Sequence, residues 1–294
     1  MKKAKKEPKS LRSERKVPYL FIAPFLISFF LFFAFPAAYS LVLSFFKYKG
    51  YGKATFIGFD NYISLLKYSA FWKSIRNTLY YFLMHIIPVM VGAFVSALIL
   101  SAKRMKRVQK IFKPLLFLPQ VVPVMATALT FRIIFATHTG VINQMLNLSI
   151  PWLEDPTLMR LCVVALVVWR STGWFMVIFL AGLTTINSDL YEASTLDGAT
   201  PLQQTFYITI PLMKPIFLFA FIMDAISSFK IYTEVNVMIA GTANAPTDAA
   251  SIMNMVTQNL ENGNFGTASA AGWLLFILIA AVSIVEQRLL SNKE

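Results

Sequence analysis

Between two long apolar runs stands the sequence Glu192-Ala193-Ser194-Thr195-Leu196-Asp197-Gly198, which continues to Ile208-Thr209-Ile210-Pro211. The runs on either side, Leu161–Ile186 and Pro215–Ala240, are each long enough to cross a bilayer as a helix, which takes about 20 apolar residues. The polar stretch is therefore a loop between two membrane spans. It predicts a helix, a glycine turn and a second helix. A compact helical hairpin in such a loop favours the docking of a soluble partner.

Capping residues mark the ends of both hairpin helices. Asp189 can cap the first helix, with a glutamate three residues on, and Gly198 suits the left-handed position that ends it. Thr200 and Gln203 predict a capping box at the start of the second helix. Pro211 is expected to stop that helix, because proline has no N–H for the helical ladder.

The composition places the chain among integral membrane proteins. Of its 294 residues 57% are hydrophobic, and the mean hydropathy is +0.62, too apolar for an ordinary soluble protein. We therefore expect an all-α integral membrane protein with six transmembrane helices. The first run is too long for a signal-peptide core, so it should remain as an anchor. The six expected spans are Pro18–Phe46, Thr78–Leu100, Pro114–Phe135, Leu161–Ile186, Pro215–Ala240 and Ala268–Leu290.

Positive charge sets the expected orientation. The net charge is +13, with eight Lys/Arg in the first 16 residues and six more in the connection after the second span (Lys103, Arg104, Lys106, Arg107, Lys110 and Lys113). Positive residues concentrate on the cytoplasmic side, so both segments, the hairpin and, with six spans, the C-terminus are placed in the cytoplasm. The loop at 47–77 also carries six Lys/Arg, but its greater length favours an external position.

The chain divides into a leader and one domain. Residues 1–17 are expected to be a disordered, basic cytoplasmic leader that orients the chain and contacts lipid headgroups, not nucleic acid. Residues 18–294 are expected to form a single transmembrane domain, with the hairpin loop at about 187–214. The last external loop, 241–267, is rich in Gly, Ala, Asn and Thr and has almost no charge.

Residue patterns that would carry enzymatic chemistry are missing from the sequence. There is no G-x4-G-K-[ST] phosphate loop, so the chain is not expected to hydrolyse a nucleotide. His85 and His138 lack metal-ligand spacing, and the single cysteine, Cys162, lies inside a span. We expect no catalytic residue, metal or cofactor in this chain.

Several charged and aromatic residues lie inside the expected spans, where ionisable groups are costly and face a cavity or a partner. In the fifth span one half of the helix carries Asp224, Ser227, Ser228, Lys230 and Glu234. Two interpretations stay open. Lys230 and Glu234, four residues apart, can form a structural ion pair. Alternatively, this face and the fourth-span Arg170 line a substrate pathway, in which aromatic residues would stack against sugar rings: Trp169, Trp174, Phe175 and Tyr232.

The hairpin residues match a named signature. Glu192-Ala193-Ser194, three residues, Gly198, nine residues and Ile208-x-Ile210-Pro211 resembles the EAA loop in permease subunits of binding-protein-dependent ABC importers. Ser194 stands where the motif has a second alanine, and Ile210 replaces a leucine. Further motifs fall in the order typical of the carbohydrate branch, and the N-terminal pattern resembles the maltose-type F or glycerol-phosphate-type A permease. They include Gly58-Phe59-Asp60-Asn61-Tyr62, Asn77-Thr78, Leu118-Pro119, Gly140-x-x-Asn143, Leu180-Ala181-Gly182-Leu183 and Asp197-Gly198-Ala199.

This resemblance implies a mechanism and partners. The EAA hairpin would be a coupling helix that inserts into a groove of a separate ATPase subunit, which binds ATP and Mg²⁺. The partners would be a second, homologous permease, two copies of the ATPase, an extracytoplasmic solute-binding protein and a sugar, in a bacterial or archaeal cytoplasmic membrane. The residues implied in coupling are Glu192, Ala193, Ser194, Asp197, Gly198, Ile208 and Pro211.

The resemblance also implies a sugar site on the fourth and fifth spans. It would lie near Trp169–Phe175 and Ser227–Tyr232. Arg170 and Lys230 would suit an anionic sugar or a phosphate, because a cation in a water-poor cavity favours negative charge. Two alternatives remain: ABC import of another polar solute, such as glycerol phosphate, and an ion-coupled secondary transporter.

Overall fold

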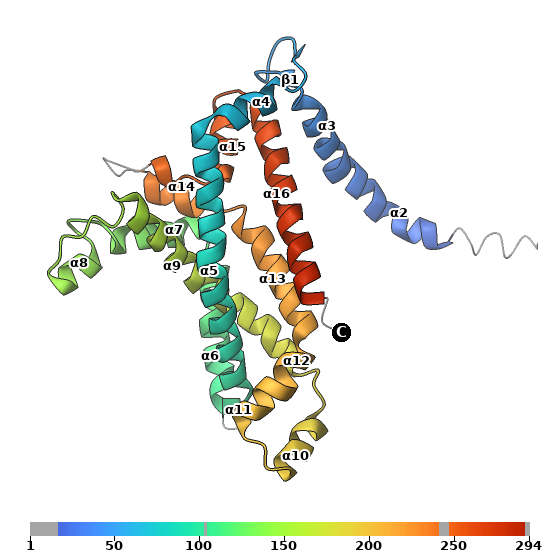
Figure 1. The fold of residues 1–294 in the computed structure, drawn as a ribbon, viewed down its shortest axis with the longest axis vertical. Coiled ribbons are helices and arrows are strands. Elements are labelled where there is room, and N and C mark those ends of the chain that lie inside the picture. Colours follow the sequence, from blue (N-terminus) through green and yellow to red (C-terminus); the bar gives the residue numbers. More distant parts are fainter. Residues whose placement is uncertain (1–16, 103–104, 241–246, 292–294) are drawn as a thin grey trace, which may run out of the picture.

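A computed structural model of the chain describes residues 17–102, 105–240 and 247–291 (Figure 1). Most of the expected leader therefore lies outside the described residues, as do Lys103 and Arg104. The described part is built of helices, apart from the antiparallel pair β1 (Phe46–Lys47) and β2 (Thr55–Phe56). The all-α class expected from the apolar runs is confirmed.

Among the described residues, five helices are long and apolar enough to cross a membrane, and a bent helix pair can supply a sixth span. The bent pair is α6 (Lys106–Val121) and α7 (Val124–Ile134), which meet at 93°. The span predicted at Pro114–Phe135 falls on this pair, and the structure adds a sharp bend within it. Pro123 explains the break, because proline disfavours helical backbone in the residue before it, and Val122 is extended.

The first span stands apart from the rest of the chain. It consists of α2 (Val17–Phe29), the π-helical turn η1 (Phe30–Ala34) and α3 (Phe35–Leu43), and it runs away from the bundle in Figure 1. Within the described chain none of the side chains in its apolar window is buried. The other spans bury part of their surface against one another, whereas this helix leaves nearly all of its surface to lipid or to another protein.

The remaining helices form the bundle and its connections. In the first half of the chain they are α4 (Asp60–Lys67), α5 (Ser69–Ser101), α6, α7, α8 (Val141–Leu146) and α9 (Pro156–Leu183). In the second half they are α10 (Ser188–Leu196), α11 (Pro201–Gln204), η3 (Thr205–Thr209), α12 (Ile210–Leu212), α13 (Lys214–Ser228), α14 (Thr233–Ile239), η4 (Thr247–Ala249), α15 (Ile252–Glu261) and α16 (Phe265–Ser291).

Close packing of α5, α6, α9, α13 and α16 forms the core. In lipid, helices associate through van der Waals contact, and small residues let their backbones approach. Gly173 of α9 shows this, because a Cβ atom there would lie 1.8 Å from the carbonyl oxygen of Leu116 in α6. The rings of Phe94, Phe179 and Phe217 meet in the same core, with centroids 4.7–5.8 Å apart.

Buried asparagines fasten the irregular segments to the helices. Asn61 donates to the carbonyl oxygens of Ser44 (2.8 Å) and Phe46 (3.0 Å) and accepts a hydrogen bond from Thr267 (3.1 Å). It thereby joins α3, β1, α4 and α16. Asn77 and Asn143 bond loop carbonyls in the same way. All three belong to the short motifs of the sequence, which therefore have structural roles.

Candidate functional site

The polar stretch at 187–204 forms the predicted helical hairpin, at the lower end of the bundle in Figure 1. Gly198 has φ +82°, the left-handed conformation expected after α10. The N-cap of α10 is Asn187, whose side chain accepts from the backbone N–H of Asp189 (3.0 Å). The assignment of Asp189 as the cap is therefore wrong. Asp189 lies in the first turn, where its charge favours the helix dipole.

The second hairpin helix runs without a loop into the fifth span. Its capping box is confirmed: the Gln203 side chain accepts from the Thr200 N–H at 2.8 Å, and Thr200 Oγ1 accepts from the Gln203 N–H at 3.4 Å. Pro211 does not stop this helix, contrary to expectation. The π-helical turn η3 takes up the extra residue before it, and α12 carries the chain on to α13.

Side-chain hydrogen bonds hold the two hairpin helices together. Gln204 Nε2 lies 2.9 Å from both Ser194 Oγ and Thr195 Oγ1, and 3.2 Å from the Tyr191 carbonyl oxygen. The Tyr191 hydroxyl pairs with Thr209 Oγ1 at 2.9 Å. Ser194, the departure from the alanine of the EAA motif, thus supplies an acceptor for Gln204. The hairpin has a fixed shape before any partner is present.

Large apolar side chains project from this polar segment. Leu196 is 90% exposed, and Leu202, Phe206 and Tyr207 are exposed as well. Exposed apolar groups gathered outside the apolar spans mark a protein-docking surface. Of the implied coupling residues, Glu192, Ala193, Asp197, Gly198 and Pro211 lie at the surface, and Ser194 and Ile208 are half-buried. Leu196 was not among the predicted coupling residues, although a leucine directly before Asp197-Gly198 in a polar loop could have indicated an exposed docking side chain.

The charges of the expected pathway are paired differently from the prediction. Glu234 of α14 lies 3.6 Å from Arg170 of α9, and both side chains are mostly buried. Lys230 is exposed and has no acidic partner among the described residues. The predicted Lys230–Glu234 pair is wrong because α13 ends at Ser228, so these residues do not share one continuous helix.

The predicted polar face of the fifth span is divided between two environments. Asp224 and Ser228 are buried, and Asp224 Oδ2 lies 3.0 Å from Nε2 of His85 in α5. Ser227 and Lys230 are exposed on the other side. In this conformation Asp224 and Ser228 are packed between helices, and their predicted place on a substrate pathway stays a prediction.

The four aromatic candidates also separate. The ring centroids of Trp169 and Phe131 (α7) lie 5.6 Å apart. Trp174 stacks on Phe117 of α6, with ring centroids 5.9 Å apart. Both remain partly exposed beside the bend of the third span. Phe175 is buried in the core, and no substrate reaches it in this conformation.

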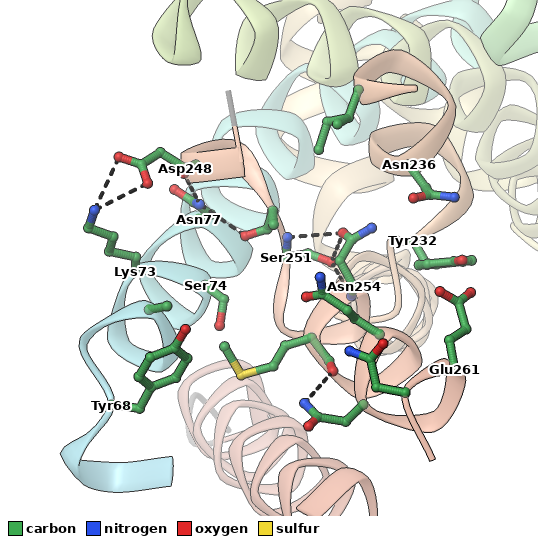
Figure 2. A pocket seen from close by; sticks show the side chains of 17 residues that line it. Tyr68, Lys73, Ser74, Asn77, Tyr232, Asn236, Asp248, Ser251, Asn254 and Glu261 are labelled. Carbon is green, nitrogen blue, oxygen red and sulfur yellow. Dashed lines mark hydrogen bonds and ion pairs between the residues drawn. The ribbon is translucent and has the colours of Figure 1, made fainter. Parts of the chain in front are cut away.

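Tyr232, the fourth aromatic, lines a polar cavity of about 590 Å³ that the sequence did not predict (Figure 2). We name it the α15 cavity, because α15 forms one wall with Asn254, Gln258, Asn259, Glu261 and Asn262. The start of α5 forms another wall, and α14 contributes Asn236. The amide-rich composition of the 241–267 loop was the one available signal.

The sequence and the fold of this chain are similar to those of known transport proteins. Residues 89–293 match the family described as "Binding-protein-dependent transport system inner membrane component". The chain is 32% identical over 293 residues to the probable ABC transporter permease protein YesP of Bacillus subtilis, covering 96% of this chain and 93% of that protein. It is 30% identical over 285 residues to the arabinooligosaccharides transport system permease protein AraP of the same organism, covering 94% and 89%.

The fold is shared with a solved transporter. A chain in the crystal structure of a bacterial alginate ABC transporter, in complex with an alginate pentasaccharide-bound periplasmic protein, superimposes with a TM-score of 0.81. The two chains are 23% identical, and the match covers 94% of each. At this identity the likeness concerns the fold.

Proposed function

Because the chain belongs to the family of inner membrane components of binding-protein-dependent transport systems, we propose that it is the permease subunit of an ATP-driven importer of sugars or oligosaccharides. The observation that carries this proposal is the preformed hairpin, which exposes Glu192 and Leu196 and continues as helix into a membrane span. The names of the relatives, which include transporters of arabinooligosaccharides and lactose, support the sugar class.

The hairpin is the element that couples ATP hydrolysis to transport. The exposed face around Glu192 and Leu196 docks into a separate ATPase subunit, which binds ATP and Mg²⁺. Gly198 permits the turn, and Ala193 permits close approach. Since no loop separates α11 from α13, closure of the ATPase moves the fifth span directly.

One hairpin per chain requires a second permease beside this one, since an importer of this kind has two ATPase subunits. The unpacked first span supports this arrangement, because its surface is free to pack against another subunit. A solute-binding protein delivers the sugar from the opposite side of the membrane. In this orientation both chain ends and the hairpin lie in the cytoplasm, and the α15 cavity faces outward.

The substrate passes between the fourth and fifth spans at the level of Trp169, Trp174 and Lys230. The pairing of Arg170 with Glu234 neutralises one of the two cations that would attract an acidic solute. A neutral sugar is therefore favoured over an anionic sugar or glycerol phosphate. An ion-coupled secondary transporter would have no use for the exposed hairpin.

Affinity purification of the chain from its native membrane, followed by mass spectrometry and an ATPase assay, tests the proposal. We expect a P-loop ATPase and a second six-span protein to co-purify, and both the ATPase and its activity to be lost in the Glu192→Ala/Leu196→Ala variant. Asp189→Ala, an exposed change on the same helix, is the matched control. A chain that purifies alone, without ATPase activity, would contradict the coupling role.

A further inference from the structure

We infer that the α15 cavity is a binding site for a neutral saccharide, which occupies it before entering the membrane-level pathway. This inference rests on the proposed import function and adds a site to it. It depends on three properties of the cavity: a fixed wall, unused hydrogen-bonding groups and one acidic side chain, Glu261, that no cation in the described lining offsets.

The wall formed by α15 is fixed on its opposite face. Ile252 and Val256 are buried in the core, so the polar side of the helix is turned toward the cavity. Ser251 caps the helix through Asn254 and donates to the carbonyl oxygen of Ile231 at 2.6 Å. This bond ties α15 to the break between α13 and α14. The wall is therefore preorganised, which reduces the entropic cost of binding.

The cavity has two kinds of polar group. At its α5 side, Asn77 donates to the carbonyl oxygens of Asp248 (2.5 Å) and Ala250 (3.0 Å), so these groups are already satisfied. In contrast, the amides of Asn236, Gln258 and Asn262 make no hydrogen bond to any part of the chain that the structure describes. Their donors and acceptors remain available to a ligand.

This set of groups suits sugar hydroxyls. An amide offers both donors and an acceptor, as a hydroxyl requires, and Tyr68 and Tyr232 add aromatic rings at the sides of the cavity (Figure 2). The volume of about 590 Å³ lies within the range of roughly 300–1,000 Å³ that small-molecule sites occupy.

The charges disfavour an acidic sugar. Lys73 lies 3.1 Å from both carboxylate oxygens of Asp248, so this pair contributes no net charge. Glu261, beside Tyr232 in Figure 2, is the remaining ionisable acid in the cavity wall. A negative wall repels a uronate and leaves neutral saccharides as the class that fits.

The cavity also connects to the pathway through one element. Tyr232 precedes α14 and lines the cavity, whereas Glu234 in the first turn of α14 reaches Arg170 in α9. The cavity and the Arg170–Glu234 pair are thus joined by residues only two positions apart in the chain.

The test uses the complete transporter complex in nanodiscs, without its binding protein. Equilibrium dialysis with radiolabelled arabinotriose, lactose and maltose measures neutral sugars, and an alginate trisaccharide is the acidic probe. Gln258→Ala/Asn262→Ala removes two exposed amides that have no protein partner, so folding is unaffected. Leu260→Ala, an exposed position of the same helix outside the cavity, is the matched control. ATP-driven uptake with the binding protein is measured in parallel.

We expect at least one neutral probe to bind, about tenfold more weakly in the double variant, with no change in the control and no binding of the alginate trisaccharide. Equal binding by the double variant, or equal binding of the acidic probe, would overturn the site. The site would also be overturned if the double variant lost affinity for the binding protein but still bound the sugar. The cavity would then be the docking face for the binding protein. If uptake proceeds but no probe binds in the cavity, this inference fails alone. If there is neither uptake nor ATPase stimulation, the proposed function fails with it.

Discussion

The buried contact between His85 of α5 and Asp224 of α13 gives the sharpest prediction about the bundle. Both side chains are at most 2% exposed, and Nε2 lies 3.0 Å from Oδ2. The distance is that of an ion pair, although Asp224 Oδ2 does not meet hydrogen-bond geometry. Neither side chain has access to water, so in the described part of the chain each group has the other as its close polar partner on this side of the bundle.

The other ring nitrogen of His85, Nδ1, is held by the backbone of its own helix. Nδ1 of His85 lies 2.7 Å from the carbonyl oxygen of Tyr81, which can only accept, so Nδ1 carries a proton. Nε2 therefore faces Oδ2 of Asp224 inside the bundle, away from water.

A double-mutant cycle follows from this arrangement. His85→Leu leaves an unpaired buried carboxylate and should cost about 3–5 kcal/mol of stability, whereas removing both polar groups in His85→Leu/Asp224→Leu should cost less than about 1 kcal/mol. Asp224→Leu completes the cycle; it leaves Nε2 without its partner and should cost about 1–3 kcal/mol. Asp224→Asn places an amide donor opposite Nε2 and should cost about 1 kcal/mol. The His85→Leu variant should therefore be much less stable than the double variant.

Thermal unfolding can be followed at the single cysteine. Cys162 is 1% exposed, so a thiol-reactive fluorophore labels it only when the bundle opens. The measurement uses the detergent-purified complex with cysteine-free partner subunits. If the double variant loses as much stability as the two single variants added together, the coupling between these groups is absent and the reasoning is refuted. If the double variant is stable but no longer supports uptake, Asp224 contributes to the substrate pathway and not only to packing.

Three further predictions concern packing and coupling. Gly173→Ala places a Cβ atom 1.8 Å from the Leu116 carbonyl oxygen and should cost about 1–3 kcal/mol in the same unfolding assay; an unchanged midpoint would mean that α6 is free to move away. Asn61→Ala leaves the Ser44 and Phe46 carbonyl oxygens without their donor and should cost about 2–3 kcal/mol, whereas Ser64→Ala on the same helix should be nearly neutral. Gln204→Met releases α10 from α11 and should reduce ATPase stimulation about fivefold with no loss of stability; full stimulation would show that the hairpin needs no fixed shape.

Local chemistry was readable from the sequence wherever one short segment decides the outcome. The capping box of Thr200 and Gln203 depends on residues three apart, and the turn at Gly198 on one backbone conformation. Both were predicted correctly. The membrane spans were found for the same reason, since about 20 consecutive apolar residues suffice to define each one.

The errors arose where a local irregularity interrupts a regular pattern or where a distant contact overrides local spacing. Pro211 fails to end its helix because a π-turn absorbs the mismatch, and the bend of the third span comes from Val122-Pro123 in an otherwise uniform apolar run. Lys230 and Glu234 have the spacing of a helical ion pair, but Glu234 pairs instead with Arg170, 64 positions earlier in the chain. The α15 cavity joins residues from Tyr68 to Asn262, and no spacing rule relates such distant segments.

The breaks in the second half of the chain have a mechanical consequence. From Pro201 to Ser228 the backbone is helical, interrupted only at Met213, and the next irregular segment follows Ser228. Movement of α10 and α11 would therefore be transmitted through η3 and α12 to α13; the turn at Met213 is the first joint on this path and the segment 229–232 is the second. That joint carries Lys230 and Tyr232 and leads directly to Glu234. The helix break at 229–232 thus lies beside the charged and aromatic groups that we propose to meet the substrate. Movement at the hairpin would therefore change the Arg170–Glu234 contact and the α15 cavity together.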